Sequence, residues 1–172
     1  VSQGIKPGDY VALFLRNDVA YVEALLGAFL VRAVPVNVNF RFTPGELSEI
    51  LADCQPKAIL VHRHLSGTLA QIDAGLRPPL TVLVDDVVEG LPGKTAELDG
   101  ALLYEEVLAA QPDGLPEVEG RSGDDIYLMY TGGTTGKPKG VMWRHEDAFY
   151  ACLGAGDYWR LGNPVSTPEE LV

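Results

Sequence analysis

Short apolar runs that alternate with amphipathic stretches limit the possible folds of this chain more than any other feature. The first run, Tyr10 to Leu15, follows the turn-forming residues KPGD. The next stretch carries apolar residues at helical spacing behind Asn17 and Asp18, either of which is suited to cap a helix. A β-branched run from Ala33 to Val38 then predicts a second strand. The chain therefore begins with a strand, a helix and another strand.

The same alternation continues through the first half of the chain. Thr43, Pro44 and Glu46 form a typical helix start, with a cap, a proline in the first turn and a capping-box acid. Further along lie a strand (Lys57 to His62), a helical stretch (Leu65 to Leu76) and another strand (Leu80 to Asp85). Strands and helices that alternate in this way predict an α/β fold: a doubly wound, mostly parallel sheet with flanking helices.

The second half of the chain has a different character. Residues Val87 to Gly123 are rich in glycine, proline and acids, so we expect an irregular surface excursion with one helix around Leu102 to Ala110. The last clear strand is Asp125 to Thr131, and a glycine-rich run follows it directly. Ligands bind at the carboxyl ends of the strands in open α/β sheets, so this run is a candidate binding site.

Charge is what sets the glycine-rich run apart. The chain has 172 residues and a net charge of −11, which argues against a nucleic-acid partner. Between Ile126 and His145, however, no acidic residue occurs, and Lys137, Lys139 and Arg144 are the charged residues. Glycines let the backbone approach a ligand closely, and lysines attract phosphate. The run therefore predicts a phosphate-binding loop, although its spacing does not fit the P-loop of NTPases.

A simpler interpretation of the same run is a solvated hairpin, because the residues YLMYT and GVMW on either side of it are able to pair as strands. The length of the signal favours the phosphate-binding interpretation. The segment YTGGTTGKPKGV, Tyr130 to Val141, closely resembles the signature loop of the adenylate-forming (ANL) superfamily, which includes acyl-CoA synthetases, luciferases and peptide-synthetase adenylation domains. Every constrained position is met from Thr131 to Gly140, with Gly132 where serine is common.

Two other segments support the resemblance. Gly4 to Leu47 is similar to the early region of fatty-acyl CoA ligases, and Gly140 to Trp159 resembles actinobacterial long-chain and steroid-type acyl-CoA synthetases. Arg32 stands where these enzymes usually carry glycine, and we expect it to alter the local turn but not the fold.

The resemblance implies an ATP-dependent acyl-CoA ligase. Such an enzyme activates a carboxylic acid, here a fatty or steroid-derived one, as an acyl-adenylate and transfers the acyl group to coenzyme A. ATP, Mg²⁺ and coenzyme A are the implied substrates and cofactors. The residues implied to hold the β- and γ-phosphates are Thr131, Gly132, Gly133, Thr134, Thr135, Gly136 and Lys139.

The family's other motifs are not found before Val172: a magnesium glutamate, a ribose-binding aspartate and the adenylation lysine of a small C-terminal domain. We therefore expect residues 1–172 to be a partial N-terminal AMP-binding domain, with the C-terminal domain absent, and to be inactive alone. Exposed apolar edges on such a piece predict self-association. Two alternatives stay open: a catalytically inert nucleotide-binding or interaction module, and an aryl-CoA ligase or another adenylating enzyme.

The sequence also allows expectations about the cellular compartment of the protein and about the roles of single histidine and aspartate residues. The apolar segments are interrupted by charges and proline, so no transmembrane segment is predicted. Two cysteines far apart in sequence indicate reduced thiols in a cytoplasmic protein, and a peripheral position at the membrane stays open. His145 is expected to cap or pack at the next helix, and His62 and His64 to be structural or exposed. Asp85 and Asp86 are expected in solvated turns.

Overall fold

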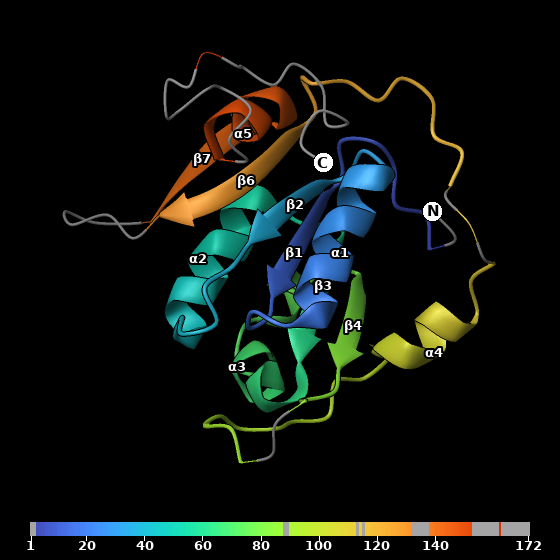
Figure 1. Cartoon of the computed structure of the whole chain (residues 1–172). Helices are drawn as coiled ribbons and strands as arrows, with labels where there is room; N and C mark the ends of the chain where they lie inside the picture. The colour runs from blue at the N-terminus through green and yellow to red at the C-terminus, as the bar shows by residue number, and fades with distance from the viewer. Residues whose placement is uncertain are drawn as a thin grey trace.

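The computed structural model describes residues 3–87, 90–112, 114, 116–131, 138–152 and 162, and its helices and strands alternate along the chain (Figure 1). The strands are β1 (Tyr10–Phe14), β2 (Val34–Asn37), β3 (Ala58–His62), β4 (Leu80–Val84), β5 (Leu102–Leu103), β6 (Ile126–Thr131) and β7 (Lys139–Arg144). The α-helices are α1 (Val19–Leu30), α2 (Pro44–Cys54), α3 (Ser66–Ala70), α4 (Tyr104–Ala109) and α5 (His145–Cys152). Two short 3-10 helices are η1 (Arg63–Leu65) and η2 (Ala74–Leu76).

The strands form one sheet in the order β5-β4-β3-β1-β2-β6-β7. All neighbouring pairs are parallel except β6 and β7, which are antiparallel. The predicted α/β fold with a mostly parallel sheet is therefore confirmed. The chain leaves β1 to form β2 on one side and β3 on the other, which is a doubly wound arrangement.

Successive residues of a strand point to opposite faces of the sheet. Each face buries its own set of apolar side chains under helices. Ala12 and Phe14 of β1 pack with α2 and α3 in the larger core cluster. Val11 and Leu13 point the other way, toward α1. The α1 and α4 side of the sheet also buries Tyr104, which packs near β4. Two layers of apolar side chains thus enclose the central strands.

Side-chain caps begin the two main helices as the sequence predicts. Asp18 caps α1, accepting a hydrogen bond from the Tyr21 backbone N–H at 3.0 Å. Thr43 and Glu46 form the expected capping box at α2, with Pro44 in the first turn. Each cap satisfies donors that the helix itself leaves unpaired.

Some expected elements differ in the structure. The helical stretch from Leu65 to Leu76 is broken into η1, α3 and η2, because Asp73 accepts from the Gly75 N–H at 2.7 Å and starts a separate turn. The helix expected from Leu102 begins only at Tyr104, since the two preceding residues pair with β4 as β5. Strand β7 follows β6, so β6 is not the last strand.

Arg32 occupies the turn between α1 and β2 with φ +61°, in the left-handed region that favours glycine. The turn keeps its hydrogen bonds, including one from the Gly8 N–H to the Arg32 carbonyl at 2.8 Å. The guanidinium pairs with both carboxylate oxygens of Asp125 at 2.8–3.1 Å, directly before β6. Arginine therefore keeps the glycine-type backbone and adds a bond to a segment 93 residues away.

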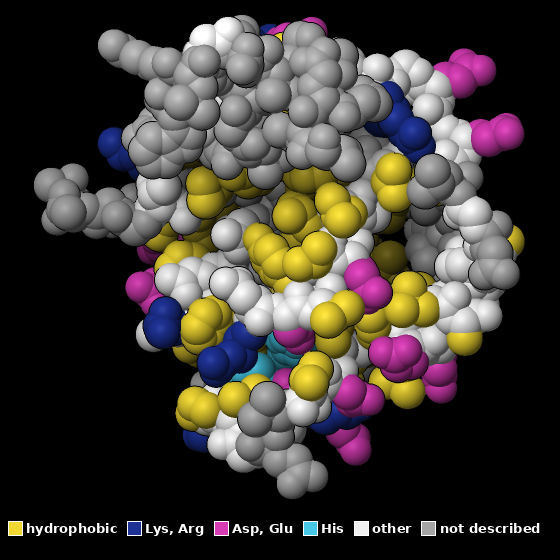
Figure 2. All heavy atoms as spheres, in the orientation of Figure 1, with side chains coloured by type: hydrophobic (Ala, Val, Ile, Leu, Met, Phe, Trp, Pro, Cys, Tyr) yellow, Lys and Arg dark blue, Asp and Glu magenta, His cyan; other side chains and the backbone are white. Residues whose placement is uncertain are grey.

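The outer face of α1 is apolar and exposed. Val19, Val22 and Leu26 are 69%, 50% and 52% exposed, whereas the buried residues of this helix are Ala20 and Ala28. Figure 2 shows hydrophobic side chains gathered on the face of the molecule where α1 lies. Within the described residues, none of the helices is both long and apolar enough to cross a membrane.

Candidate functional site

The ends of the predicted phosphate-binding loop lie across from each other at the tip of the β6–β7 hairpin. Six residue pairs hold the hairpin together, from Ile126 opposite Arg144 to Thr131 opposite Lys139. The hairpin pairing considered from the sequence is thus present. Thr131 and Lys139 are both exposed, and the Thr131 hydroxyl donates to the Lys139 carbonyl at 3.5 Å. The hairpin therefore presents a hydroxyl and an ammonium group side by side at the carboxyl end of β6.

Five of the seven predicted site residues, Gly132 to Gly136, lie outside the described residues, and so does Lys137. The structure brings together the two that it describes, Thr131 and Lys139. The roles of all seven stay predictions.

A cavity of about 590 Å³ lies beside the loop ends, between the hairpin and α2. Its hairpin wall comprises Tyr130, Pro138, Lys139 and Gly140, and its helix wall comprises Glu49, Ile50, Ala52 and Asp53. One side thus carries an ammonium group and the other side carboxylates. A phosphate group entering here is attracted by the Lys139 side and repelled by the helix side, which favours binding close to the hairpin.

Tyr130 links the two walls of this cavity. Its phenol donates to the Asp53 carboxylate at 2.5 Å, although the two residues are 77 positions apart in sequence. Burial and the hydrogen bond to Asp53 raise the pKa of Tyr130, so the phenol keeps its proton near neutral pH. Burial likewise raises the pKa of the neighbouring Cys54 thiol to about 11, which makes it an unreactive free thiol. Sequence reasoning missed Asp53, because nothing local marks that residue.

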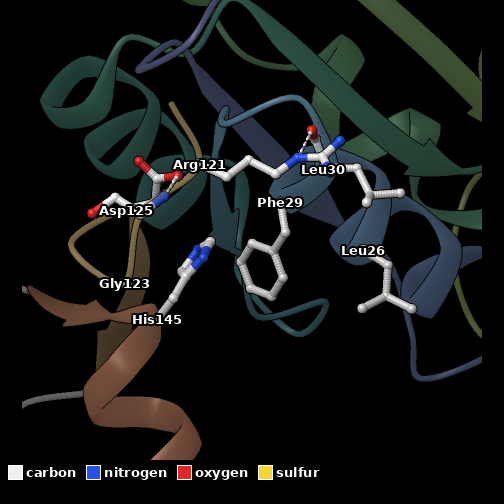
Figure 3. A pocket seen from close by; sticks show the side chains of 8 residues that line it. Leu26, Phe29, Leu30, Arg121, Gly123, Asp125 and His145 are labelled. Atoms are coloured by element: carbon white, nitrogen blue, oxygen red, sulfur yellow. Dashed lines mark hydrogen bonds between the residues drawn. The ribbon is translucent and has the colours of Figure 1, made fainter. Parts of the chain in front are cut away.

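A second cavity, of about 550 Å³, lies at the opposite end of β6 (Figure 3). The rings of Phe29 and His145 pack edge to face there, with centroids 4.2 Å apart and an interplanar angle of 61°, and Leu26 and Leu30 add apolar surface. His145 begins α5 and packs as predicted. Burial lowers its pKa, although Asp125 and a hydrogen bond with the Ile126 backbone act in the opposite sense. This end is about 17 Å from the loop along the strand, so it belongs to a different site.

Ion pairs stabilise the base of the hairpin, where β6 begins and β7 ends. Besides the Arg32–Asp125 pair, Arg144 contacts Asp124 and Asp147, each at 2.8 Å. The backbone N–H of His145 also donates to the backbone carbonyl of Asp125 at 2.7 Å. The start of β6 and the end of β7 are therefore tied to one another and to the α1–β2 turn.

The other two histidines are structural. His62 is buried, bonds to Asp18 at 2.7 Å through Nε2 and accepts the Arg16 N–H at 3.0 Å through Nδ1. His64 is also buried and pairs through Nδ1 with Asp86. The expectation that Asp86 lies in a solvated turn is therefore wrong, because the buried imidazole draws its carboxylate inward. Asp85 is exposed and pairs with Arg63.

Comparison with known proteins gives the hairpin a context. The family model described as AMP-binding enzyme matches residues 1–167. The 3-oxocholest-4-en-26-oate–CoA ligase of Rhodococcus rhodochrous is 40% identical over 172 residues, which cover 99% of this chain and 30% of that protein. The medium-chain acyl-CoA ligase Mig of Mycobacterium avium is 42% identical over 164 residues, or 95% of this chain and 29% of that protein.

Solved structures show the same fold. The anthranilate CoA ligase AuaEII in complex with anthranoyl-AMP superposes with a TM-score of 0.76 at 25% identity, covering 91% of this chain and 28% of that one. The inhibitor-bound N-terminal domain of FACL13 from Mycobacterium tuberculosis gives 0.64 at 31% identity, covering 84% and 33%. This chain thus spans roughly a third or less of the proteins it matches. With the family model matched along nearly its whole length, the chain belongs to the AMP-binding enzyme family.

Proposed function

We propose that residues 1–172 are part of the N-terminal AMP-binding domain of an ATP-dependent acyl-CoA ligase, and that the loop from Thr131 to Lys139 binds the β- and γ-phosphates of ATP. The observation that carries the proposal is the position of the two ends of this loop. They lie opposite each other on paired strands at the carboxyl end of β6, beside a cavity, in a chain of the AMP-binding family.

The proposed reaction has two steps. A carboxylate oxygen attacks the α-phosphorus of ATP, and pyrophosphate leaves with the electrons of the broken P–O bond. The thiol of coenzyme A then attacks the acyl carbonyl, loses its proton and displaces AMP. Charge accumulates on the departing pyrophosphate in the first step, so fixed donors at Thr131 and a cation at Lys139 stabilise its transition state.

The acid is proposed to be fatty or steroid-derived. The supporting observation is that relatives at 40% and 42% identity are a steroid-acid ligase and a medium-chain acyl-CoA ligase. The anthranilate ligase is less similar in sequence, at 25% identity, and keeps an aryl acid as the alternative. A panel of fatty, steroid and aryl acids assayed with the full-length protein separates these classes.

We propose that Mg²⁺ binds together with ATP. Proteins commonly hold this ion through substrate phosphates and one or two carboxylates. Within the described part of the chain, no group of three or more metal-binding side chains is assembled, so these residues supply no cage of their own. Neither of the two steps above relies on a magnesium contact from this chain.

Two further proposals concern the setting of the enzyme. The buried free thiol of Cys54 is in keeping with a reducing compartment, and we place the enzyme in the cytoplasm. The exposed apolar face of α1 supports self-association of the 172-residue chain, which sedimentation velocity would detect as a species larger than a monomer.

Carboxylate-dependent exchange of labelled pyrophosphate into ATP tests the proposed function. We expect exchange with the full-length protein and none with residues 1–172 alone. Robust exchange by the 172-residue chain would refute its assignment as an incomplete catalytic unit. Nucleotide binding without exchange by the full-length protein would favour an inert nucleotide-binding module instead.

A further inference from the structure

Tyr130 has contacts that the phosphate-binding role of the neighbouring loop does not explain. It is the residue directly before Thr131 on β6, and its side chain is only 8% exposed. The phenol reaches α2, where it donates to the Asp53 carboxylate at 2.5 Å. The phenol is therefore fixed at the end of a helix that otherwise faces the hairpin across a cavity.

The aromatic ring of Tyr130 lies next to its cross-strand neighbour on β7. Gly140 is its cross-strand partner. A Cβ atom at Gly140 would lie 3.4 Å and 3.5 Å from Cε1 and Cζ of the tyrosine ring, and 3.0 Å from the Leu128 side chain. The ring therefore lies beside β7, within van der Waals reach of a Cβ atom at position 140. The residues that follow on each strand toward the tip, Thr131 and Lys139, are the two ends of the loop.

We propose that Tyr130 is a positioning residue for ATP: held by Asp53, it fixes both ends of the Thr131–Lys139 loop relative to α2. This inference rests on the proposed function of the loop. The phenol anchors β6 to the helix, and the pairing of Thr131 with Lys139 extends that anchor to β7. When Thr131 and Lys139 are held in place before ATP binds, they lose less conformational freedom on binding its phosphates.

Replacing Tyr130 by phenylalanine in the full-length protein tests the proposal. Tyr130→Phe keeps the ring over Gly140 but removes the bond to Asp53. A hydrogen bond to a charged group changes the equilibrium constant of the process that depends on it by about a factor of ten or more. We expect the KM for ATP in the exchange assay to rise about tenfold, with the KM for the acid changed by less than about twofold.

Tyr104→Phe is the matched control. Tyr104 is also 8% exposed, and its phenol donates to a helix carboxylate, that of Glu23 in α1, at 2.7 Å. It follows β5 at the far edge of the sheet from the hairpin. The two variants should lower the melting temperature by similar amounts, but only Tyr130→Phe should weaken ATP binding. A merely structural role predicts the same KM for ATP in both.

Changes at Asp53 test the other partner. Asp53→Asn keeps an oxygen acceptor for the phenol and should stay within about threefold of the wild-type KM for ATP. Asp53→Ala removes the acceptor and should match Tyr130→Phe, and combining these two should add little further loss because they break one bond. If Tyr130→Phe does not fold, the comparison of Asn with Ala at Asp53 carries the test.

The outcomes separate the inference from the function beneath it. Exchange by the wild type together with an unchanged KM for ATP in Tyr130→Phe overturns the positioning role alone. An equal rise in Tyr104→Phe overturns it as well. Absence of exchange in the wild-type full-length protein overturns the proposed function, and this inference with it.

Discussion

Replacing Arg32 by alanine and, separately, by glycine tests whether the backbone at this turn is strained. Both variants remove the guanidinium and its bonds to Asp125, so the lost ion pair cancels when the two are compared. What differs between them is the ease of adopting φ +61° and the freedom of the unfolded chain. The comparison therefore isolates the backbone from the side chain.

The size of the effect follows from these two differences. A left-handed conformation costs a residue with a Cβ atom about 1–2 kcal/mol relative to glycine. Glycine, in turn, loses about 0.4–1 kcal/mol more through the greater entropy of its unfolded chain. We expect the glycine variant to be the more stable one by about 0.5–1 kcal/mol. For a chain of this length, 1 kcal/mol corresponds to roughly 2–4 °C in melting temperature.

The neighbouring residue Val31, with φ −96°, provides the control. Alanine needs no strained conformation at that position, so only the entropy difference remains, and alanine should be the more stable variant by about 0.4–1 kcal/mol. The preference should thus reverse between positions 31 and 32. Urea unfolding of the four variants of the 172-residue chain, analysed with a common slope, measures both differences. If alanine proved more stable than glycine at both positions, the turn at Arg32 would not be strained.

Three further predictions concern the loop, the hairpin base and two glycines. Lys139→Met in the full-length protein should lower the adenylation rate about a hundredfold through loss of a phosphate contact, measured by pyrophosphate exchange with an unchanged melting temperature as the control. Burial lowers the pKa of His145, so the unfolded chain binds a proton more readily than the folded chain. The stability of the chain should therefore fall as the pH drops below about 6.5. His145→Gln should reduce this pH dependence of the urea unfolding midpoint between pH 7.5 and 5. Gly67→Ala places a Cβ 2.3 Å from the Lys94 carbonyl oxygen and should destabilise the chain by about 1–3 kcal/mol. Gly27→Ala on α1 meets nothing within 4 Å and should stabilise it by up to about 1 kcal/mol; equal melting temperatures for the two would contradict the packing at Gly67.

Local patterns in the sequence were sufficient to predict those features of the structure that depend on interactions between residues close together in the chain. The caps at Asp18 and Thr43 act on backbone groups within three residues. The sequence predicts the Thr43 cap and narrows the first cap to Asn17 or Asp18. The alternation of strands and helices predicts the parallel sheet for the same reason, since each element carries its own periodicity. The resemblance of the loop after Thr131 to the ANL signature is also a property of consecutive residues, and the family assignment confirms it.

Contacts between distant residues required the tertiary structure. Asp53 meets Tyr130 across 77 positions and Arg32 meets Asp125 across 93, and no sequence pattern marks either pair. The same holds for β5, which is two residues long and exists because it pairs with β4. Short-range chemistry thus determined which elements form and which segment carries the family's signature sequence. The order of the strands, and the side chains brought against that loop, were decided by burying both faces of the sheet at once, which depends on the whole chain.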